Sequence, residues 1–196
     1  MELTGIVLGG GKSRRMGGED KTLLKINGET LVERAVKALR PWCGDIIIAS
    51  NAAAKYRVAN TVEVIDSWPD IGPLGGIHAG LAAAEHDFAM VVAGDMPFFS
   101  GRLTACLLRR RTPEAQIVIA DGGRGPEPLC ALYGRTCLPL IEEMVRRGVY
   151  APRELLRETK HVIVTKEELR RDDVPENIFF NLNSAEDKRR WLGGTL

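Results

Sequence analysis

The stretch LGGGKSRRMGGEDK, from Leu8 to Lys21, decides the fold that we expect for this chain. It follows an apolar run, residues 5–8, which has the composition of a short buried strand. Glycines at 9, 10 and 11 break any regular element, and without Cβ atoms they let backbone N–H groups approach a ligand closely. Basic residues follow at Lys12, Arg14 and Arg15. A strand that leads into such a loop predicts a phosphate-binding site.

Two familiar phosphate loops do not fit this stretch. The P-loop pattern GxxxxGK[ST] finds its tail in residues 11–13, but its first glycine would fall on Ile6. The dinucleotide pattern GxGxxG begins correctly at residues 9–11, but Arg14 takes the place of its third glycine. The second expected strand also ends without the carboxylate that this pattern requires. Both patterns are therefore excluded by position.

The rest of the chain alternates between strand and helix patterns, which is typical of a mostly parallel sheet covered by helices. We therefore expect an α/β protein with three α/β/α layers, Rossmann-like, in which the strand at 129–133 pairs differently from the parallel core. The 196 residues fit one domain, residues 1–196. Strands are expected at 5–8, 45–50, 62–65, 88–93, 116–120, 129–133 and 162–164, and helices at 31–39, 52–59, 77–85, 103–108 and 139–147, with a last helix capped by Ser184 and Asp187.

Composition limits the function further. The formal net charge of +1 gives no reason to expect a nucleic acid or an anionic membrane as partner. No apolar run is long enough for a transmembrane helix, and the chain enters a strand without a signal peptide, so we expect a cytoplasmic protein. The cysteines have neither metal-site nor CxxC spacing and are expected to be free, buried thiols: Cys43, Cys106, Cys130 and Cys137.

Two carboxylates follow expected strands. Asp66 comes after strand 62–65 and precedes a second glycine-rich turn, residues 67–76. Asp95 comes after strand 88–93, the most continuously apolar one, which predicts a place near the middle of the sheet. Because parallel sheets bind ligands at the carboxyl ends of their strands, Asp95 is suited to hold Mg²⁺ beside phosphates. The alternative is that Asp95 caps the next helix, for which Ser100 competes.

The opening motif resembles LAGGxSxRMGxxK, the signature of nucleotidyltransferases of the nucleotide-diphospho-sugar transferase fold. Within that superfamily the chain is most similar to the molybdenum cofactor guanylyltransferases. The resemblance spans nearly the whole chain, because three later stretches match in order: residues 72–76 (GPLGG), 94–98 (GDMPF) and 181–187 (NLNSAED).

The resemblance implies roles for particular residues. Asp95 matches the metal aspartate, Lys21 the phosphate lysine, and Asn183 or Asn181 an asparagine on the metal or pterin side. Arg15 and Lys21 would neutralise the leaving pyrophosphate. The chain departs from the family pattern at Ala49, which replaces an asparagine that Asn51 would supply, and at Gly9, which replaces the usual alanine. The expected nucleotide-binding residues are Leu8, Gly9, Gly10, Gly11, Lys21, Asn51, Asp66, Gly75 and Asp95.

The reaction implied by the resemblance joins GMP from GTP to the phosphate of molybdopterin, or of Mo-molybdopterin, with Mg²⁺ as cofactor and release of pyrophosphate. Family analogy also implies contact with molybdoenzyme maturation proteins. The acceptor would be bound by Asn181 and by a second basic cluster, Arg146, Tyr150 and Arg153, whose plainer interpretation is a solvated helix end.

Other functions stay open at this point. A related enzyme would use CTP, or another phosphorylated acceptor; Gly9 and Gly10 favour guanine, because the cytidylyl relatives usually read LAAG. A nucleotide-binding regulator without catalysis is a third possibility, against which the presence of both Lys21 and Asp95 argues. His78 lies near the second glycine-rich turn, and as a lone histidine on an alanine-rich helix it is expected to be a plain surface residue.

Overall fold

The computed structural model describes residues 2–9, 20–66, 68 and 70–182. Several sequence-based expectations fall outside the described residues: those for Gly10, Gly11, Arg15 and Asn183, and the helix capped by Ser184 and Asp187.

A seven-stranded sheet forms the centre of the described structure, with the order β5-β4-β1-β6-β8-β7-β9. Strand β8 is antiparallel to both of its neighbours, whereas every other pairing in this sheet is parallel. The expected fold class is therefore confirmed, including the strand that pairs differently. The strands are β1 (Thr4–Leu8), β4 (Asp45–Ser50), β5 (Val62–Ile65), β6 (Phe88–Ala93), β7 (Ile117–Asp121), β8 (Pro126–Gly134) and β9 (His161–Val164).

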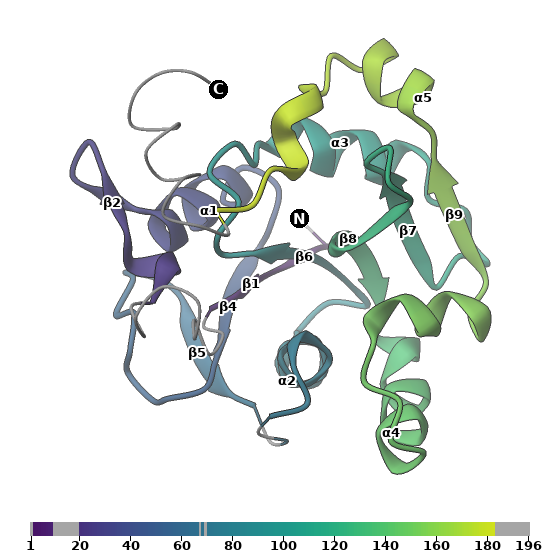
Figure 1. Ribbon diagram of the computed structural model, residues 1–196, viewed down its shortest axis with the longest axis horizontal. Coiled ribbons are helices and arrows are strands. Elements are labelled where there is room, and N and C mark those ends of the chain that lie inside the picture. The colour runs from purple at the N-terminus through teal and green to yellow at the C-terminus, as the bar shows by residue number, and fades with distance from the viewer. Residues whose placement is uncertain (1, 10–19, 67, 69, 183–196) are drawn as a thin grey trace.

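Helices cover both faces of the sheet, as Figure 1 shows: α1 and α3 lie on one side and α2 and α4 on the other. A small hairpin of β2 (Lys25–Ile26) and β3 (Glu29–Thr30) turns at Asn27 and Gly28, which both have positive φ. The α-helices are α1 (Leu31–Leu39), α2 (Pro73–Ala83), α3 (Gly101–Arg109), α4 (Leu138–Arg146) and α5 (Lys166–Arg171), and the 3-10 helices are η2 (Lys21–Leu23), η3 (Arg135–Cys137), η4 (Pro152–Arg157) and η5 (Glu176–Phe179).

Alternation along the strands produces two hydrophobic clusters, one on each face. In β1, Ile6 packs into the cluster that contains Leu74 and Ile77 of α2, whereas Val7 packs into the cluster of α1 and α3. Both side chains are fully buried. Successive strand residues point to opposite faces, so a strand buried on both sides must be apolar throughout. This is why the segments at 45–50 and 88–93 have no polar residue in their interiors. The four cysteines are free and buried, as expected.

The expected helix at 52–59 is wrong, because this segment consists of turns and bends. Ala54, Arg57 and Asn60 have positive φ, which a right-handed helix excludes. The carboxylate of Glu63 on β5 accepts the N–H groups of residues 55, 56 and 57, at 2.9, 3.1 and 2.7 Å. A side chain from the following strand thus supplies hydrogen bonds that a helix would have made within itself, which the helix propensity of the segment could not indicate.

Helix α2 begins at Pro73, four residues before the expected start at 77. Proline is favoured at the first helical position, because its fixed φ suits the helix and its missing N–H would have no partner there. The glycines at 75, 76 and 80 therefore lie on the helix, where they allow close packing. A Cβ atom at Gly80 would lie 2.6 Å from Cγ2 of Ile6. The α2 backbone consequently rests directly on β1.

We predict that Gly80→Ala destabilises the protein, although alanine is the better helix former. The added methyl group must push apart α2 and Ile6, and overpacking of this kind costs about 1–3 kcal/mol. Urea unfolding of the variant and the parent measures the difference. Combining it with Ile6→Ala should give a loss smaller than the sum of the two single losses, because the second change opens the space that the first requires. Strict additivity would contradict the contact.

Candidate nucleotide-binding site

The order of the strands reverses between β1 and β6, and the expected site residues gather at this point. The chain passes from β1 outward to β4 and β5, and then returns to β6 on the other side of β1. Leu8, the last residue of β1, pairs with Ala49 of β4 and Ala93 of β6. Hydrogen bonds continue past the strand end, from Gly9 N to Ala49 O at 2.8 Å and from Gly94 N to Leu8 O at 2.9 Å. A reversal of strand order opens a crevice at the carboxyl edge, where α/β proteins bind ligands.

Asp66 lies against the first turn of α2. A Cβ atom at Gly75 would come within 2.2 Å of its carboxylate, so only glycine fits beneath this side chain. The backbone N–H of Trp68 donates to Asp66 Oδ1 at 2.8 Å. Burial raises the pKa of Asp66, although the Trp68 hydrogen bond and the nearby His78 oppose the shift. The predicted pair of Asp66 and Gly75 is thus in direct contact at the carboxyl edge of the sheet.

Asp95 lies two residues after the end of β6, and its neighbour Gly94 is hydrogen-bonded to Leu8 at the end of β1. Burial raises the pKa of its carboxyl group, Lys21 opposes this effect, and Asp20 adds to it. Lys21 and Asp95 are therefore close enough to interact electrostatically. Helix α3 begins at Gly101 with Ser100 as its N-cap residue, so capping does not explain the place of Asp95.

The residues present fit a magnesium ion. The buried Asp95 carboxylate carries a charge that its surroundings do not fully compensate, which is the condition that a cation relieves. Mg²⁺ usually takes only one or two carboxylates and completes its shell with water and substrate phosphates. Among the described residues no three His, Cys, Asp or Glu side chains gather as a metal cage would require. This donor set suits a metal that arrives with a phosphate ligand.

Asn51 and His78 are two further residues for which the sequence raised an expectation. Asn51 is exposed after β4, and its Oδ1 accepts a hydrogen bond from Lys55 Nζ at 3.3 Å. The expectation that His78 is a plain surface residue is wrong: its side chain is only 13% exposed and its ring lies 4.3 Å from that of Trp68. Its Nε2 is 3.4 Å from Glu142 on α4. No pattern in the sequence revealed these partners, because they come from separate segments.

The residues expected to bind the acceptor are spread over the other half of the sheet. Arg153 lies over Gly125, its guanidinium 3.8 Å from the position of a Cβ atom there. Arg153 also faces Glu127, whose pKa is raised by burial despite this positive neighbour. Tyr150 is exposed, and Arg146 forms an ion pair with Glu143 on its own helix. The structure therefore brings Arg153 to the carboxyl edge, while the Arg146 charge is already paired at the end of α4.

The segment after η5 also reaches the site. The backbone N–H of Leu182 donates to the carbonyl oxygen of Asp95 at 3.1 Å, and the rings of Phe98 and Phe180 lie 5.9 Å apart. Asn181 donates from Nδ2 to the carbonyl oxygen of Phe179 at 3.3 Å. Leu182, a described residue of the C-terminal motif, is thus bonded directly to the residue that follows β6 by two positions.

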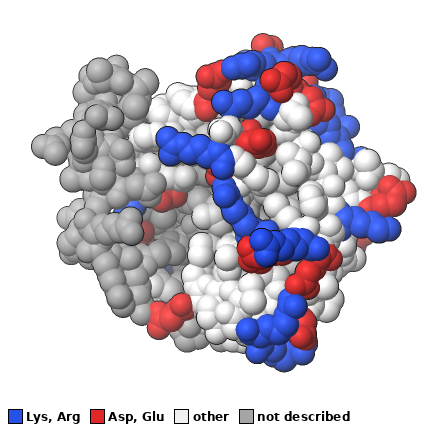
Figure 2. Space-filling view, turned by 45° about the vertical axis from the view of Figure 1, so that its right-hand side comes forward, with Lys and Arg blue, Asp and Glu red and all other residues white. Residues whose placement is uncertain are grey.

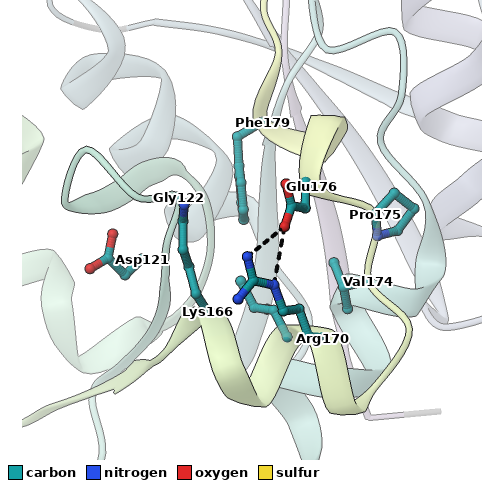
Figure 3. Close-up of a pocket in the computed structure, with 9 residues that line it drawn as sticks. Asp121, Gly122, Lys166, Arg170, Val174, Pro175, Glu176 and Phe179 are labelled. Atoms are coloured by element: carbon teal, nitrogen blue, oxygen red, sulfur yellow. Dashed lines mark hydrogen bonds and ion pairs between the residues drawn. The ribbon is translucent and has the colours of Figure 1, made fainter.

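A pocket of about 90 Å³ opens beside these residues, between the end of β7, helix α5 and η5. Figure 3 shows Arg170 reaching across it to Glu176, with which it makes contacts of 2.8 and 3.1 Å. Figure 2 shows basic and acidic side chains interspersed over the described part of this face, so no large field of one sign is present. None of the expected site residues lines the pocket, whose lining is Asp121, Gly122, Lys166, Leu169, Arg170, Val174, Pro175, Glu176 and Phe179.

The fold is that of an α/β protein whose strand order reverses between β1 and β6, which is where such proteins bind ligands. Residues 5–163 match the MobA-like NTP transferase domain. The chain is 32% identical to the molybdenum cofactor guanylyltransferase of Desulfosudis oleivorans over 94% of this chain and 92% of that protein. It is 31% identical to the enzyme of the same name from Vibrio cholerae, over 93% of this chain and 87% of that protein. The chain therefore belongs to the MobA-like NTP transferase family.

A solved structure supports the same fold. The molybdopterin-guanine dinucleotide biosynthesis protein A of Archaeoglobus fulgidus superposes with a TM-score of 0.80, covering 98% of this chain and all of that chain at 24% identity. Over the residues that the structure describes, no helix has the length and apolar character needed to cross a lipid bilayer.

We predict that Asp95→Asn stabilises the metal-free protein at neutral pH. The folded pKa of Asp95 is raised, so the native state binds more protons than the unfolded state between the two pKa values. The free energy of unfolding therefore falls as pH rises from the unfolded to the folded pKa of Asp95. An asparagine does not ionise, so the variant does not undergo this fall. In thermal melts without divalent cations, the melting temperature of the variant relative to that of the parent should rise between pH 4 and pH 7.

Asp172→Asn provides a control of opposite sign. Asp172 has a lowered pKa because of its partners Cys106, Arg109 and Arg110, so its charge stabilises the protein above the unfolded pKa. This variant should lose melting temperature relative to the parent as pH rises toward about 4, and the loss should then stay constant from pH 4 to pH 7. If Asp95→Asn also shows no change relative to the parent between pH 4 and pH 7, the uncompensated charge at Asp95 is refuted.

Proposed function

We propose that this chain, as a single nucleotidyltransferase domain over residues 1–196, is a Mg²⁺-dependent guanylyltransferase. It transfers GMP from GTP to the phosphate of molybdopterin or Mo-molybdopterin, forms the guanine dinucleotide and releases pyrophosphate. The observation that carries the proposal is the shared name of its relatives, molybdenum cofactor guanylyltransferase, at over 30% identity along nearly the full chain. The proposal is supported by Asp66 and Asp95, which follow β5 and β6 at the carboxyl edge of the sheet beside the point where the strand order reverses.

In nucleotidyl transfer the protein mainly positions the substrates and stabilises the charge on the phosphates, because the reacting atoms belong to the substrates. In the proposal, the backbone N–H groups of Gly10 and Gly11 would bind the phosphates, since the Gly9 N–H already donates to Ala49 O. Arg15 and Lys21 would neutralise the charge that develops on pyrophosphate. Lys21 already lies within electrostatic reach of Asp95. Leu8, Asn51, Asp66 and Gly75 would bind the nucleoside part, which the contact of Asp66 with α2 supports.

Asp95, with Asn183, would hold Mg²⁺, and the ion would supply a Lewis acid and positive charge for the phosphate groups. Asp95 suits this role by its chemistry, since its burial leaves a carboxylate charge that a divalent cation would satisfy.

The acceptor would bind on the β8 side of Asp95. Arg153 is the best supported of its expected ligands, because it lies at the carboxyl edge over Gly125 and beside Glu127. Asn181 belongs to the segment attached to the end of β6. Arg146 and Tyr150 complete the proposed set. We also place the protein in the cytoplasm, in contact with molybdoenzyme maturation proteins, in keeping with its free buried cysteines and with cofactor biosynthesis.

We predict that GTP with Mg²⁺ raises the melting temperature more than CTP, ATP or UTP does. A ligand that binds only the native state adds about 2.7 kcal/mol of stability at a concentration about 100 times its Kd. A site that pairs with one base edge leaves buried polar groups unpaired with the others. A thermal-shift panel of the four nucleotides measures this preference. Equal or greater stabilisation by CTP would rule out guanine selectivity.

We also predict that Asp95→Asn removes Mg²⁺-dependent transfer while the fold is retained. The amide has nearly the same size as the carboxylate but lacks the charge that recruits the metal. The measurement is pyrophosphate release during a Mg²⁺ titration of both proteins, with GTP and molybdopterin present and folding checked by thermal melt. A variant with the parental rate and metal dependence would place the metal elsewhere, and Asp66 would become the next residue to test.

A further inference from the structure

A cluster of polar side chains joins the exit of the glycine loop to the segment between β4 and β5. It consists of Asp20, Thr22, Lys55 and Tyr56, and we call it the Asp20 cluster. Asp20 Oδ1 accepts the backbone N–H of Thr22 at 3.0 Å and the Thr22 hydroxyl at 2.6 Å. Asp20 Oδ2 accepts the Tyr56 hydroxyl at 3.0 Å and pairs with Lys55 Nζ at 2.5 Å. Both carboxylate oxygens are thus fully engaged.

The protonation states of the Asp20 cluster suit these bonds. Burial disfavours the charge on Asp20, but the bonds from Lys55 and Thr22 outweigh it and hold the pKa of Asp20 below its usual value. Burial, together with the Asp20 charge, holds the pKa of Tyr56 well above its usual value. At ordinary pH the carboxylate therefore accepts and the phenol donates. A charge-assisted network of this kind is stronger than neutral hydrogen bonds and fixes its members in place.

The Asp20 cluster is anchored to the sheet through Glu63 and Gly9. Glu63 accepts the backbone N–H groups of Lys55 and Tyr56, so it fixes the segment that carries both side chains. The Tyr56 ring occupies the space beside Gly9, where a Cβ atom would lie 2.5 Å from ring atom Cε2. Tyr56 is only 9% exposed. One tyrosine thus contacts the loop where it leaves β1 and, through its hydroxyl, where it reaches Asp20.

We propose that the Asp20 cluster positions Lys21 for the nucleotide phosphates. Asp20 is the N-cap residue of η2, and Lys21 is the first residue of that short helix. Fixing Asp20 therefore fixes the backbone from which the Lys21 side chain extends toward Asp95. Asp20, Lys55 and Tyr56 act here as positioning residues and not as phosphate ligands. The inference rests on the proposed function only in requiring that Lys21 binds a nucleoside triphosphate; neither the base nor the acceptor enters it.

The test is a double-mutant cycle between Asp20→Asn and Lys21→Ala. An amide at position 20 keeps the size of the side chain but loses the charge that pairs with Lys55. We expect kcat to fall by about 10- to 100-fold, since a catalytic group displaced by about 1 Å can lose that much. The KM for GTP should change less than kcat. In the Lys21→Ala background, Asp20→Asn should have no further effect, because the group that it positions is already gone.

Tyr56→Phe is the second variant, in case Asp20→Asn fails to fold. It keeps the ring beside Gly9 and removes only the hydroxyl, so it should lower kcat in the same direction and lose its effect in the Lys21→Ala background. Equal losses in both backgrounds would overturn the proposal, because the Asp20 cluster would then act independently of Lys21. Full activity of a folded Asp20→Asn or Tyr56→Phe variant would overturn it as well.

Two controls separate positioning from general destabilisation. Tyr133→Phe removes another buried phenol that donates a hydrogen bond, to the carbonyl oxygen of Pro128 at 2.8 Å. Asp172→Asn removes another carboxylate held by basic side chains, those of Arg109 and Arg110. Both should lower the melting temperature while kcat and KM stay at the parental values. If the controls reduce kcat as strongly as Asp20→Asn does, the effect is structural and the proposal fails.

The same cycle is also measured by equilibrium binding, which separates this inference from the proposed function. The Kd of the nucleotide selected by the thermal-shift panel is determined by calorimetry with Mg²⁺ for the parent, both single variants and the double variant. If no transfer to molybdopterin occurs but Asp20→Asn weakens nucleotide binding only when Lys21 is present, the proposed function fails and the positioning role stands. If the two losses add, the positioning role fails whatever the reaction is.

Discussion

The hydrogen bonding of β1 to a parallel strand on each side is the constraint on which the site depends. The register with β4 and β6 aligns the three strand ends at Leu8, Ala49 and Ala93, and the bonds from Gly9 and Gly94 carry the alignment one residue further. A one-residue slip of β1 would exchange Ile6 and Val7 between the two hydrophobic clusters. The hydrophobic core thus sets the register, and the register sets which backbone groups face the crevice.

Stability and function oppose each other at the carboxyl edge of the sheet. Asp66 and Asp95 both have partly buried carboxyl groups with raised pKa values, and partners such as Lys21 only partly offset the loss of solvation. A core optimised for stability would not retain such groups, because an uncompensated buried charge is costly. The electrostatic imbalance at the end of β6 is the physical reason to look for a cation there. By contrast, Asp20 is fully compensated by Lys55 and Thr22, as expected for a structural carboxylate.

Most of the fold could be predicted from the sequence, because its strands are buried on both faces and its helices have one apolar face. The strand at 45–50 has the predicted bounds, and Gly75 of the glycine-rich stretch lies against Asp66. The prediction failed where distant side chains decide the backbone: Glu63 replaces a helix at 52–59 by turns. For the same reason no signal in the sequence indicated the contacts of Tyr56 and Lys55 with Asp20, or the tilted ring contact between Trp68 and His78. Each contact joins segments that no local pattern connects.

The contact between Gly9 and Tyr56 couples the evolution of the glycine loop to that of a segment distant from it in sequence. Relatives that carry alanine at the position of Gly9 must leave open the volume that the Tyr56 ring fills here, because the two groups exclude each other. Substitutions at these two positions are thus coupled. A protein with Gly9 and Tyr56 can acquire alanine at position 9 only if residue 56 also changes or the segment at 51–60 moves. A loop exchanged between family members for a new base preference would have to bring residue 56 with it, although more than thirty residues separate it from Lys21.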